Sequence, residues 1–457
     1  MSSERLYYNE KMERLLQTRE MAELQLVKLQ KQVKVAYENS AYYRASFDEA
    51  GVKPGDIRTV EDFRGRIPLF DKKKHQASQM ESLVKEGHGF GTHLCVKPQE
   101  IVLVGATSGT TGEPTFYTFT RNDLRVLYES VGRGLWRMGA RPGDRIVHAF
   151  ALGMFAAGVP LVQALEDFGA LAIPAGMNLG TEKVVLMSRI AGANGILSTP
   201  SFIEHMIEKA RGAMGMDVKD LGLKRLMVGG EPGAGVPEVR KKIETAFQGR
   251  LYDLIGVVWG IMGCSCDEEE YQGMHFLTED LSFVEILDPE SGELLPNEEG
   301  VTGTAVLTSL DWEAGPPIRY SIGDVVRIHT RPCPCGRTGL RMRVIGRSDD
   351  MLKVKGVIVY PAAIRSVLET FVPRITREFR ILLETPPPRV LPPLKLKLEK
   401  GEGIQEEALP PLAEEIRQAL HAKLQFTPEI RFVEPLSLER SEHKTNYFER
   451  LYEKPGH

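Results

Sequence analysis

Residues 104–116, VGATSGTTGEPTF, form a run of small and hydroxylated residues that is suited to holding an anion. Glycine admits left-handed backbone angles and lets the main chain approach a ligand closely. Serine and threonine hydroxyls add donors to the backbone N–H groups. The NTPase P-loop is excluded, because it needs a lysine after its last glycine and here Gly112 is followed by Glu113. A glycine-rich turn without a ligand is the alternative to a phosphate loop.

The cysteines are the second set of residues with evident chemistry. Of the five in the chain, four fall in the short stretches Cys264-Ser-Cys266 and Cys333-Pro-Cys335. Together with His275 they offer thiolate and imidazole ligands, which suit tetrahedral Zn²⁺. Reduced, unliganded thiols are the alternative, because C-x-C spacing is less diagnostic of a metal site than C-x-x-C.

The elements that must position these residues alternate along the chain. Short apolar runs at 144–150, 170–176, 195–200 and 224–232 are typical of buried strands, and the stretches at 122–139, 181–191 and 201–213 are typical of helices. Strand, turn and helix in repetition predict parallel sheets covered by helices. Residues 10–43 have helical spacing of apolar side chains, and residues 282–345 are rich in strand signals. A proline-rich break at 385–393 lies within a final part of α+β character.

The bulk composition narrows the class of protein. A chain of 457 residues exceeds one ordinary domain, and its 42% hydrophobic and 26% charged residues are typical of a soluble globular protein. The net charge of -4 argues against broad binding to nucleic acid or to an anionic membrane. No stretch is apolar and long enough to cross a bilayer, and the N-terminus lacks the core of a signal peptide, so we expect a cytoplasmic protein.

Six separated motifs, read together, resemble one family. They are SGTTGEPT (108–115), FALGMFAAG (150–158), GGEP (229–232), PIRYSIGD (317–324), GRSDDMLKVKGVIVYP (346–361) and LERSEHK (438–444). In type and order they are similar to motifs of the adenylate-forming enzymes, and within that superfamily to those of the phenylacetate–CoA ligases. GRSDD together with RY-x-x-GD carries most of the specificity.

The resemblance implies a fold and a reaction. The expected fold is α/β: an AMP-binding domain over 1–348, of parallel or mixed sheets covered by helices plus a β-rich subdomain, and a small mobile α+β lid domain over 349–457. The implied enzyme is an acid–thiol ligase that uses ATP and Mg²⁺ to convert an aromatic, phenylacetate-like acid to an acyl-adenylate and then to an acyl-CoA. A homodimer is possible. An adenylating enzyme with an acceptor other than CoA, and a nucleotide- or acyl-CoA-binding homologue without turnover, are the alternatives.

The resemblance also implies roles for individual residues. Lys444 and Thr110 are the implied catalytic groups, although Lys444 by itself could be an ordinary surface lysine. Asp324 is expected to accept the ribose hydroxyls and Arg347 to join it, Asp349 is the implied hinge and Gly356 the implied CoA contact. The full set for the nucleotide is Ser108, Gly109, Thr110, Thr111, Gly112, Thr115, Gly230, Glu231, Pro232, Asp324 and Arg347. The acyl-pocket set is Phe150, Leu152 and Phe155, and the set for structural Zn²⁺ is Cys266, His275, Cys333 and Cys335, with Cys264 as the substitute for Cys266.

One departure from the family pattern concerns magnesium. The family has a Mg²⁺-binding glutamate after its nucleotide-binding strand, where this chain reads LYDLIGVVWGIMGCSC. Alignment on Ile-Met-Gly places Gly260 at that position, and alignment on Gly256 places Trp259 there. Neither supplies an oxygen ligand. Water, phosphate oxygens or an acid from residues 267–270 are the substitutes, and a slow, repurposed or inactive member is the other interpretation.

Overall fold

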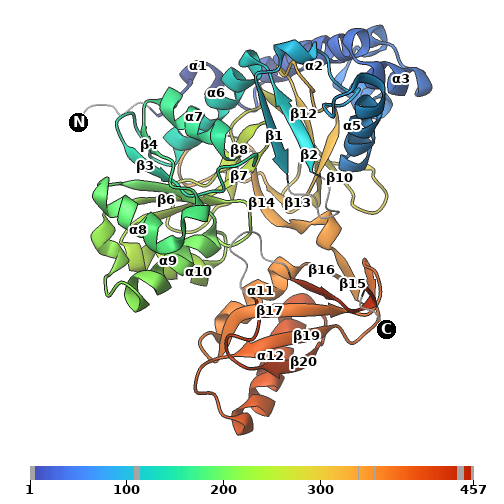
Figure 1. The fold of residues 1–457 in the computed structure, drawn as a ribbon. Helices are drawn as coiled ribbons and strands as arrows, with labels where there is room; N and C mark the ends of the chain where they lie inside the picture. Colours follow the sequence, from blue (N-terminus) through green and yellow to red (C-terminus); the bar gives the residue numbers. More distant parts are fainter. Residues whose placement is uncertain are drawn as a thin grey trace. The chain divides into compact units, whose positions relative to one another are not determined.

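The computed structural model describes residues 6–107, 114–155, 157–337, 339–354, 357–439 and 447–453 (Figure 1). The chain forms two compact units. The first comprises Met1–Gly230, Ile243–Ile322 and Arg327–Arg343, and the second comprises Glu231–Lys242, Gly323–Val326 and Val344–His457. Among the described helices, none combines the length and the apolar character that a membrane span requires.

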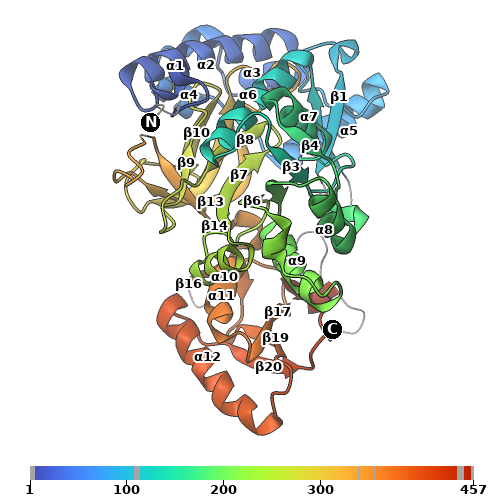
Figure 2. The same ribbon diagram turned by 90° about the vertical axis from the view of Figure 1, so that its left-hand side faces the viewer.

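The first unit begins with helices. They are α1 (Glu10–Glu13), α2 (Arg19–Asn39), α3 (Ala41–Glu49), α4 (Val60–Arg66) and α5 (Lys72–Glu86). The predicted helical segment at 10–43 is therefore divided, and the division between α2 and α3 has a local cause. Ser40 has an extended backbone, and its side chain accepts a hydrogen bond from the N–H of Tyr43, which starts a new helix. Figure 2 shows α2 and α4 beside β10 (Ser282–Leu287), where Phe63 of α4 meets Phe283 edge to face.

A two-stranded antiparallel hairpin frames the predicted phosphate loop. It consists of β1 (Leu103–Thr107) and β2 (Thr115–Phe119), and its last pair joins Thr107 to Thr115. The connecting residues 108–113 lie outside the described residues.

A 12-stranded mixed sheet dominates the chain, in the order β11-β10-β12-β13-β14-β9-β8-β7-β6-β5-β3-β4. Its parallel half consists of β3 (Arg145–His148), β4 (Leu171–Ile173), β5 (Gly195–Ser198), β6 (Arg225–Gly229) and β7 (Arg250–Val257). These strands alternate with α6 (Arg121–Arg137), α7 (Val159–Phe168), α8 (Thr181–Ile190), α9 (Pro200–Gly212) and α10 (Pro237–Phe247). Of the apolar runs predicted as buried strands, β3, β5 and β6 are largely buried, as parallel strands under helices must be. The prediction is wrong for β4, which is the edge strand of the sheet and leaves Leu171 exposed.

The other half of the sheet contains the antiparallel pairs β7–β8, β8–β9, β9–β14, β10–β12 and β10–β11. Its further strands are β8 (Gly260–Cys264), β9 (Met274–Phe276), β11 (Leu294–Leu295), β12 (Thr302–Ser309), β13 (Tyr320–His329) and β14 (Arg341–Arg347). This half accounts for the strand signals of residues 282–345.

The C-terminal part of the chain has the predicted α+β character. A four-stranded sheet has the order β20-β19-β17-β21, and a three-stranded sheet has the order β16-β15-β18. The strands are β15 (Leu352–Val354), β16 (Val357–Val359), β17 (Ile375–Leu383), β18 (Arg389–Val390), β19 (Lys395–Lys400), β20 (Glu429–Val433) and β21 (Phe448–Arg450), and the helices are α11 (Pro361–Leu368) and α12 (Leu409–Leu424). Leu412, Ile416 and Leu420 of α12 recur at helical spacing and enter a core with β17 and β19.

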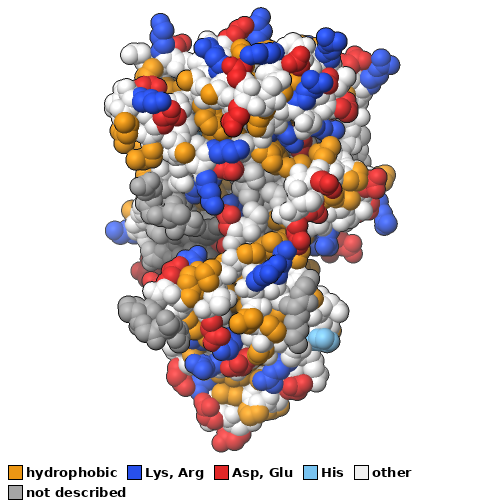
Figure 3. Space-filling view, turned by 90° about the vertical axis from the view of Figure 1, so that its right-hand side faces the viewer, with side chains coloured by type: hydrophobic (Ala, Val, Ile, Leu, Met, Phe, Trp, Pro, Cys, Tyr) orange, Lys and Arg blue, Asp and Glu red, His pale blue; other side chains and the backbone are white. Residues whose placement is uncertain are grey.

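The surface drawn in Figure 3 carries basic and acidic side chains interspersed with one another and with scattered apolar ones. On this face the charges therefore alternate in sign, in keeping with the small net charge of -4.

Candidate functional site

The base of the predicted phosphate loop is joined directly to the predicted acyl-pocket segment. The N–H of Ala106 in β1 donates to the carbonyl oxygen of Met154 at 2.5 Å, and Ala106 forms a parallel bridge with Phe155. A Cβ at Gly158 would lie 2.6 Å from the carbonyl oxygen of Leu152, so the tight turn of this segment requires glycine. Phe150 is buried, whereas Phe155 keeps 39% of its surface exposed. An aromatic side chain is therefore accessible next to the hairpin that holds the loop.

Several of the expected nucleotide and catalytic residues lie outside the described part of the chain. These are Ser108, Gly109, Thr110, Thr111, Gly112, Gly356 and Lys444. Thr115 is described and fully buried, and within the described residues its Oγ1 has no hydrogen-bond partner.

The GGEP turn follows β6, and both of its glycines are required by geometry. A Cβ at Gly229 would lie 2.7 Å from the carbonyl oxygen of Leu254 on the neighbouring strand β7. Gly230 has a φ of +84°, which other residues rarely adopt. Glu231 and Pro232 follow directly. The turn thus lies at the carboxyl end of a central parallel strand, where ligands of open α/β sheets bind.

Asp324, Arg347 and Asp349 meet within the second unit. Arg347 Nη1 lies 3.0 Å from Asp324 Oδ1, and Nη2 lies 3.4 Å from Asp349 Oδ2. Burial opposes the charge of the guanidinium, but the two carboxylates outweigh it and raise the pKa of Arg347. Gly323 has a φ of +79°, and a Cβ there would lie 2.5 Å from Arg347 Nη2, so a larger residue would strain the backbone and displace the guanidinium. The predicted contact between Arg347 and Asp324 is present, and Asp349 shares the same arginine.

The packing of the β7–β8 hairpin explains why this chain lacks a glutamate at the position where the family's Mg²⁺-binding glutamate is expected. Its register shifts between Ile255 and Gly256, which accommodates an extra residue. Trp259 at the tip is 8% exposed and packs edge to face between Tyr117 and Tyr320, with ring centroids 5.6 and 5.2 Å away. Trp259 is therefore packed as a core aromatic side chain.

Gly260, the other aligned position, cannot carry a carboxylate either. Its φ is +123°, and a Cβ there would lie 2.0 Å from Oγ of Ser130 on α6. The acidic run at 267–270 is at the opposite end of the hairpin, because the hydroxyl of Tyr252 donates to Oδ1 of Asp267 at 2.5 Å. At roughly 3.3 Å per residue, that end lies roughly 20 Å from the tip. The interpretation that an acid from this run replaces the glutamate is therefore wrong for this hairpin.

Four of the soft ligands converge at the ends of adjacent strands of the first unit. Cys266 follows β8, His275 lies on β9, and Cys333 and Cys335 lie before β14; their ligand atoms are all within 4.8 Å of one another. The Sγ atoms of Cys266 and Cys333 are 3.7 Å apart, and Sγ of Cys335 is 3.5 Å from Nε2 of His275. A tetrahedral Zn²⁺ with ordinary bond lengths separates two sulfurs by about 3.8 Å and a sulfur from a nitrogen by about 3.6 Å. The donor set and its spacing fit zinc.

The three cysteines of the cluster differ in the direction in which their surroundings shift the thiol pKa. Contact with Cys335 and burial raise the pKa of Cys266, and burial raises the pKa of Cys333, although a backbone N–H two residues further along acts in the opposite direction on each thiol. The Cys266 thiol also donates to Cys335, which lowers the pKa of Cys335 and raises that of Cys266. Burial lowers the pKa of His275 and keeps its imidazole neutral, as a metal ligand must be.

Cys264 lies apart from these four residues. Its strand pairs it with His275, but its thiol is fully buried and donates to the carbonyl oxygen of Gly134 on α6 at 3.7 Å. Burial raises the pKa of this thiol to about 12. Cys264 is therefore a core thiol in contact with a helix, and Cys266 is the residue that joins the cluster.

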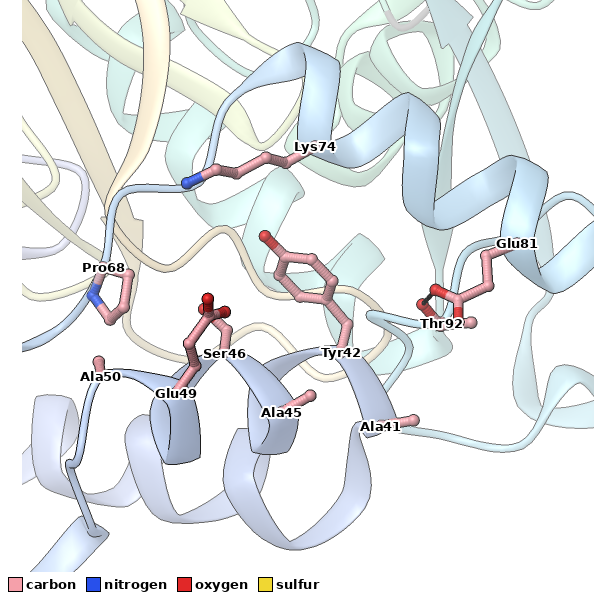
Figure 4. Close-up of a pocket in the computed structure, with 10 residues that line it drawn as sticks. All are labelled: Ala41, Tyr42, Ala45, Ser46, Glu49, Ala50, Pro68, Lys74, Glu81 and Thr92. Atoms are coloured by element: carbon pink, nitrogen blue, oxygen red, sulfur yellow. Dashed lines mark hydrogen bonds between the residues drawn. The ribbon is translucent and has the colours of Figure 1, made fainter.

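A separate pocket of about 510 Å³ opens between α3 and α5 (Figure 4). Tyr42, Glu49 and Lys74 line it together with small residues of α3, and Glu81 accepts a hydrogen bond from Thr92 at its edge. None of the residues that the sequence motifs single out lines this pocket. We therefore assign it no part in the candidate site.

Sequence reasoning did not single out two features of the site. The first is the aromatic contact of Trp259 with Tyr117 and Tyr320, which come from three distant segments and carry no shared motif. The second is Arg137, which lies in the last turn of α6 and is 2% exposed. An arginine in the last turn of an amphipathic helix normally indicates a favourable interaction with the helix dipole, so no local signal distinguishes this one.

Comparisons with known proteins agree with the motifs. Residues 356–449 match the family described as AMP-binding enzyme C-terminal domain. A phenylacetate-coenzyme A ligase of Thermus thermophilus is 34% identical over 403 residues, which cover 87% of this chain and 86% of that protein. A phenylacetate-coenzyme A ligase of Escherichia coli is 33% identical over 356 residues, 77% of each chain.

Solved structures of a 2-hydroxyisobutyryl-CoA ligase share the fold. One, in the postadenylation state in complex with R3-HIB-AMP, has a TM-score of 0.88 at 27% identity and covers 99% of this chain and 94% of that chain. Another, with 2-HIB-AMP and CoA in the thioesterification state, has a TM-score of 0.71 at 28% identity and covers 98% and 93%. The first structure holds R3-HIB-AMP and the second holds 2-HIB-AMP and CoA, in a fold that this chain shares over nearly its whole length.

Proposed function

We propose, since the chain belongs to the phenylacetate–coenzyme A ligase family of adenylate-forming enzymes, that its acid substrate is aromatic and resembles phenylacetate. The chain is an AMP-forming acyl-CoA ligase. The observation that carries the proposal for the acid is the 34% identity over 403 residues to a phenylacetate-coenzyme A ligase. The half-exposed Phe155, held beside the phosphate hairpin through Ala106 and Met154, supports it by offering an aromatic surface to a ring.

We infer that the nucleotide is held by the motif residues in the roles their chemistry allows. Residues 108–112 and Thr115 surround phosphate oxygens with N–H and hydroxyl donors. The turn of Gly230, Glu231 and Pro232 contacts the adenine, and Asp324 accepts the ribose hydroxyls. The fixed contact of Arg347 with Asp324 at 3.0 Å supports this, because a held carboxylate loses little entropy when ribose binds.

Lys444 is the proposed catalytic cation, with Thr110 as its partner on the phosphate loop. Attack of a carboxylate on the α-phosphate brings two anions together, and a lysine ammonium between them reduces their repulsion. The described residues of the β7–β8 hairpin do not fit a Mg²⁺ site, since they place Trp259 or Gly260 where the carboxylate would be. We therefore assign Mg²⁺ no protein ligand at this hairpin.

The two-step chemistry requires a second arrangement of the C-terminal part. We propose an AMP-binding domain over 1–348 and a lid over 349–457, with Asp349 as the hinge and Gly356 at the CoA site. The side chain of Asp349 is 72% exposed, and its ion pair with Arg347 is 3.4 Å long. A weakly held, exposed residue between β14 and β15 supports a role in which its backbone angles change.

We also propose a structural Zn²⁺ bound by Cys266, His275, Cys333 and Cys335. The spacing of their ligand atoms, which matches tetrahedral coordination, supports it. When bound, the ion links the ends of β8, β9 and β14 and leaves no open position for catalysis.

A panel of acids tests the substrate proposal. Phenylacetate, benzoate and 2-hydroxyisobutyrate are each incubated with ATP, Mg²⁺ and CoA, and AMP and the thioester are quantified by mass spectrometry. We expect kcat/KM for phenylacetate to exceed that for 2-hydroxyisobutyrate by about tenfold or more, because a ring pocket leaves a small acid poorly packed. A preference for the aliphatic acid would contradict the proposal. Acid-dependent pyrophosphate exchange without any thioester would favour an acceptor other than CoA.

Two variants separate the roles of the residues. Phe155→Ala should raise KM for phenylacetate by about tenfold, and Val159→Ala, equally exposed just after the same segment, is the matched control. Lys444→Ala should abolish ATP–pyrophosphate exchange in a chain that melts like the wild type. Exchange that persists in Lys444→Ala would remove the role assigned to that lysine.

A further inference from the structure

Arg137 is a buried arginine without a salt-bridge partner among the described residues. It is 2% exposed, and neither Nη1 nor Nη2 has a hydrogen-bond partner there. Arg133, one turn earlier on α6, is equally buried but fully paired: its Nη1 and Nη2 lie 2.5 and 2.9 Å from the carboxylate oxygens of Asp280, and its Nε lies 2.9 Å from Glu129. The contrast between two arginines on one helix shows that the isolation of Arg137 is specific to its position.

An unpaired buried guanidinium is costly, because the charge loses its hydration and gains nothing in return. The groups that act on Arg137 are Arg337, Glu13 and the thiols of Cys264 and Cys335. Arg337 repels it. Burial raises the pKa of Glu13, whose Oε1 accepts the N–H of Asn9 at 2.9 Å. Glu13 attracts Arg137 but forms no ion pair with it among the described residues, and the other groups that favour the charge of Arg137 are the thiols of Cys264 and Cys335.

The packing of α6 on β8 brings Arg137 toward the cysteine cluster. Oγ of Ser130 fills the space above Gly260, and the carbonyl oxygen of Gly134 accepts the thiol of Cys264. The helix and the strand lie side by side in Figure 2. Arg137 is three residues beyond Gly134 and so lies on the same face of the helix, next to the chain that leads into Cys266. Its charge also acts on His275.

The charge expected of the metal centre is opposite to that of Arg137, and this inference rests on the zinc site proposed above. A divalent cation held by three thiolates and one neutral imidazole carries a single net negative charge. We infer that Arg137 is the buried counter-ion of this anionic metal–thiolate centre. The metal-free chain then contains an unbalanced buried cation, and the metal-loaded chain contains a neutral pair.

This role predicts effects of opposite sign in the two forms of the protein. Arg137→Met keeps most of the side-chain volume and removes the charge. In the metal-free chain it should leave the denaturant midpoint unchanged or raise it, because it removes an unpaired buried charge. In the metal-loaded chain it should weaken zinc binding by about 10- to 100-fold, the usual effect of removing a group that supports the ligands. A residue that only fills space would lower the stability of both forms.

The experiment uses the full-length chain as wild type, Arg137→Met, Arg137→Lys and Arg133→Met. Zinc affinity and release are measured by competition with the chromophoric chelator 4-(2-pyridylazo)resorcinol, and urea midpoints are measured before and after zinc removal. Arg137→Lys should hold zinc within a few-fold of the wild type, because it retains the charge. Arg133→Met should lower both midpoints by leaving Asp280 unpaired, with zinc affinity close to that of the wild type.

The outcomes separate this inference from the zinc proposal. A wild-type chain that takes up no zinc overturns both. A wild type that binds one zinc per chain while Arg137→Met binds it equally tightly overturns the counter-ion role alone, as does a loss of stability in metal-free Arg137→Met that matches Arg133→Met. Glu13→Gln should leave zinc binding intact. Loss of zinc in that variant would assign the support of the metal centre to Glu13 and not to Arg137.

Discussion

Replacement of Gly260 by alanine tests why this chain has no glutamate at the family's magnesium position. Gly260 has a φ of +123°, and an added Cβ would lie 2.0 Å from Oγ and 3.0 Å from Cβ of Ser130. Ser130 cannot move freely, because it is buried in α6 and its hydroxyl donates to the carbonyl oxygen of Leu127 at 2.7 Å. The substitution therefore adds backbone strain of about 1–3 kcal/mol and overpacking of about 1–3 kcal/mol. We expect a total loss of about 2–6 kcal/mol in the free energy of unfolding.

A matched glycine separates the two contributions. Gly143 also has a positive φ, +89°, but an added Cβ there would have nothing within 4 Å, so Gly143→Ala should cost the strain alone. Ser130→Ala removes the closest atom, and the double variant with Gly260→Ala should recover about 1 kcal/mol or more of the loss. The strain component should remain.

Tryptophan fluorescence is a suitable probe of urea unfolding for these variants. All three tryptophans, Trp136, Trp259 and Trp312, lie in the first unit, so the signal reports the unit that contains the hairpin. A loss of stability in Gly260→Ala no larger than in Gly143→Ala, or no recovery with Ser130→Ala, would refute the steric explanation. In either case the hairpin has room for a side chain, and the absence of the glutamate needs another explanation.

Three further predictions concern the metal, the hinge and the response to pH. Cys266→Ser should lose its zinc and Cys264→Ser should keep one per chain by elemental analysis; the reverse pattern would exchange their roles. Asp349→Pro fixes φ at the proposed hinge and should slow thioester formation from acyl-adenylate by about tenfold or more while ATP–pyrophosphate exchange continues; equal loss of both steps would contradict the hinge. Burial raises the pKa of Glu279 from 4.5 to about 7. A raised folded-state pKa contributes stability that is present below pH 4.5 and lost as pH rises to about 7, by up to about 3 kcal/mol. In Glu279→Gln the urea midpoint should lose this slope, and an unchanged slope would assign it to other groups.

Local sequence signals predicted much of the architecture. The apolar runs of the parallel strands and the helical spacing of α6, α8, α9 and α12 are properties of adjacent residues, and burial of both faces of the strands follows from them. The break between α2 and α3 was less visible in advance. It depends on the side chain of Ser40 accepting a hydrogen bond from Tyr43, which competes with continuation of one long helix.

The pairing of strands decided which cysteine joins the metal cluster, a choice that the local sequence left open. The spacing of Cys264 and Cys266 allowed either to be a ligand. The end of β8 at Cys264 and its contact with Gly134 leave only Cys266 free to approach His275, Cys333 and Cys335.

Residue types and their order along the chain determined the family, the reaction class and the kind of ligand that each motif can offer, because those depend on side-chain chemistry. Strand register and the packing of α6 over β8 decided three further points. They are which of two cysteines joins a metal, whether an acidic run reaches the hairpin tip, and why Arg137 lacks an ion-pair partner among the described residues. These are contacts between separate segments of the chain, whose energies no local stretch of sequence contains.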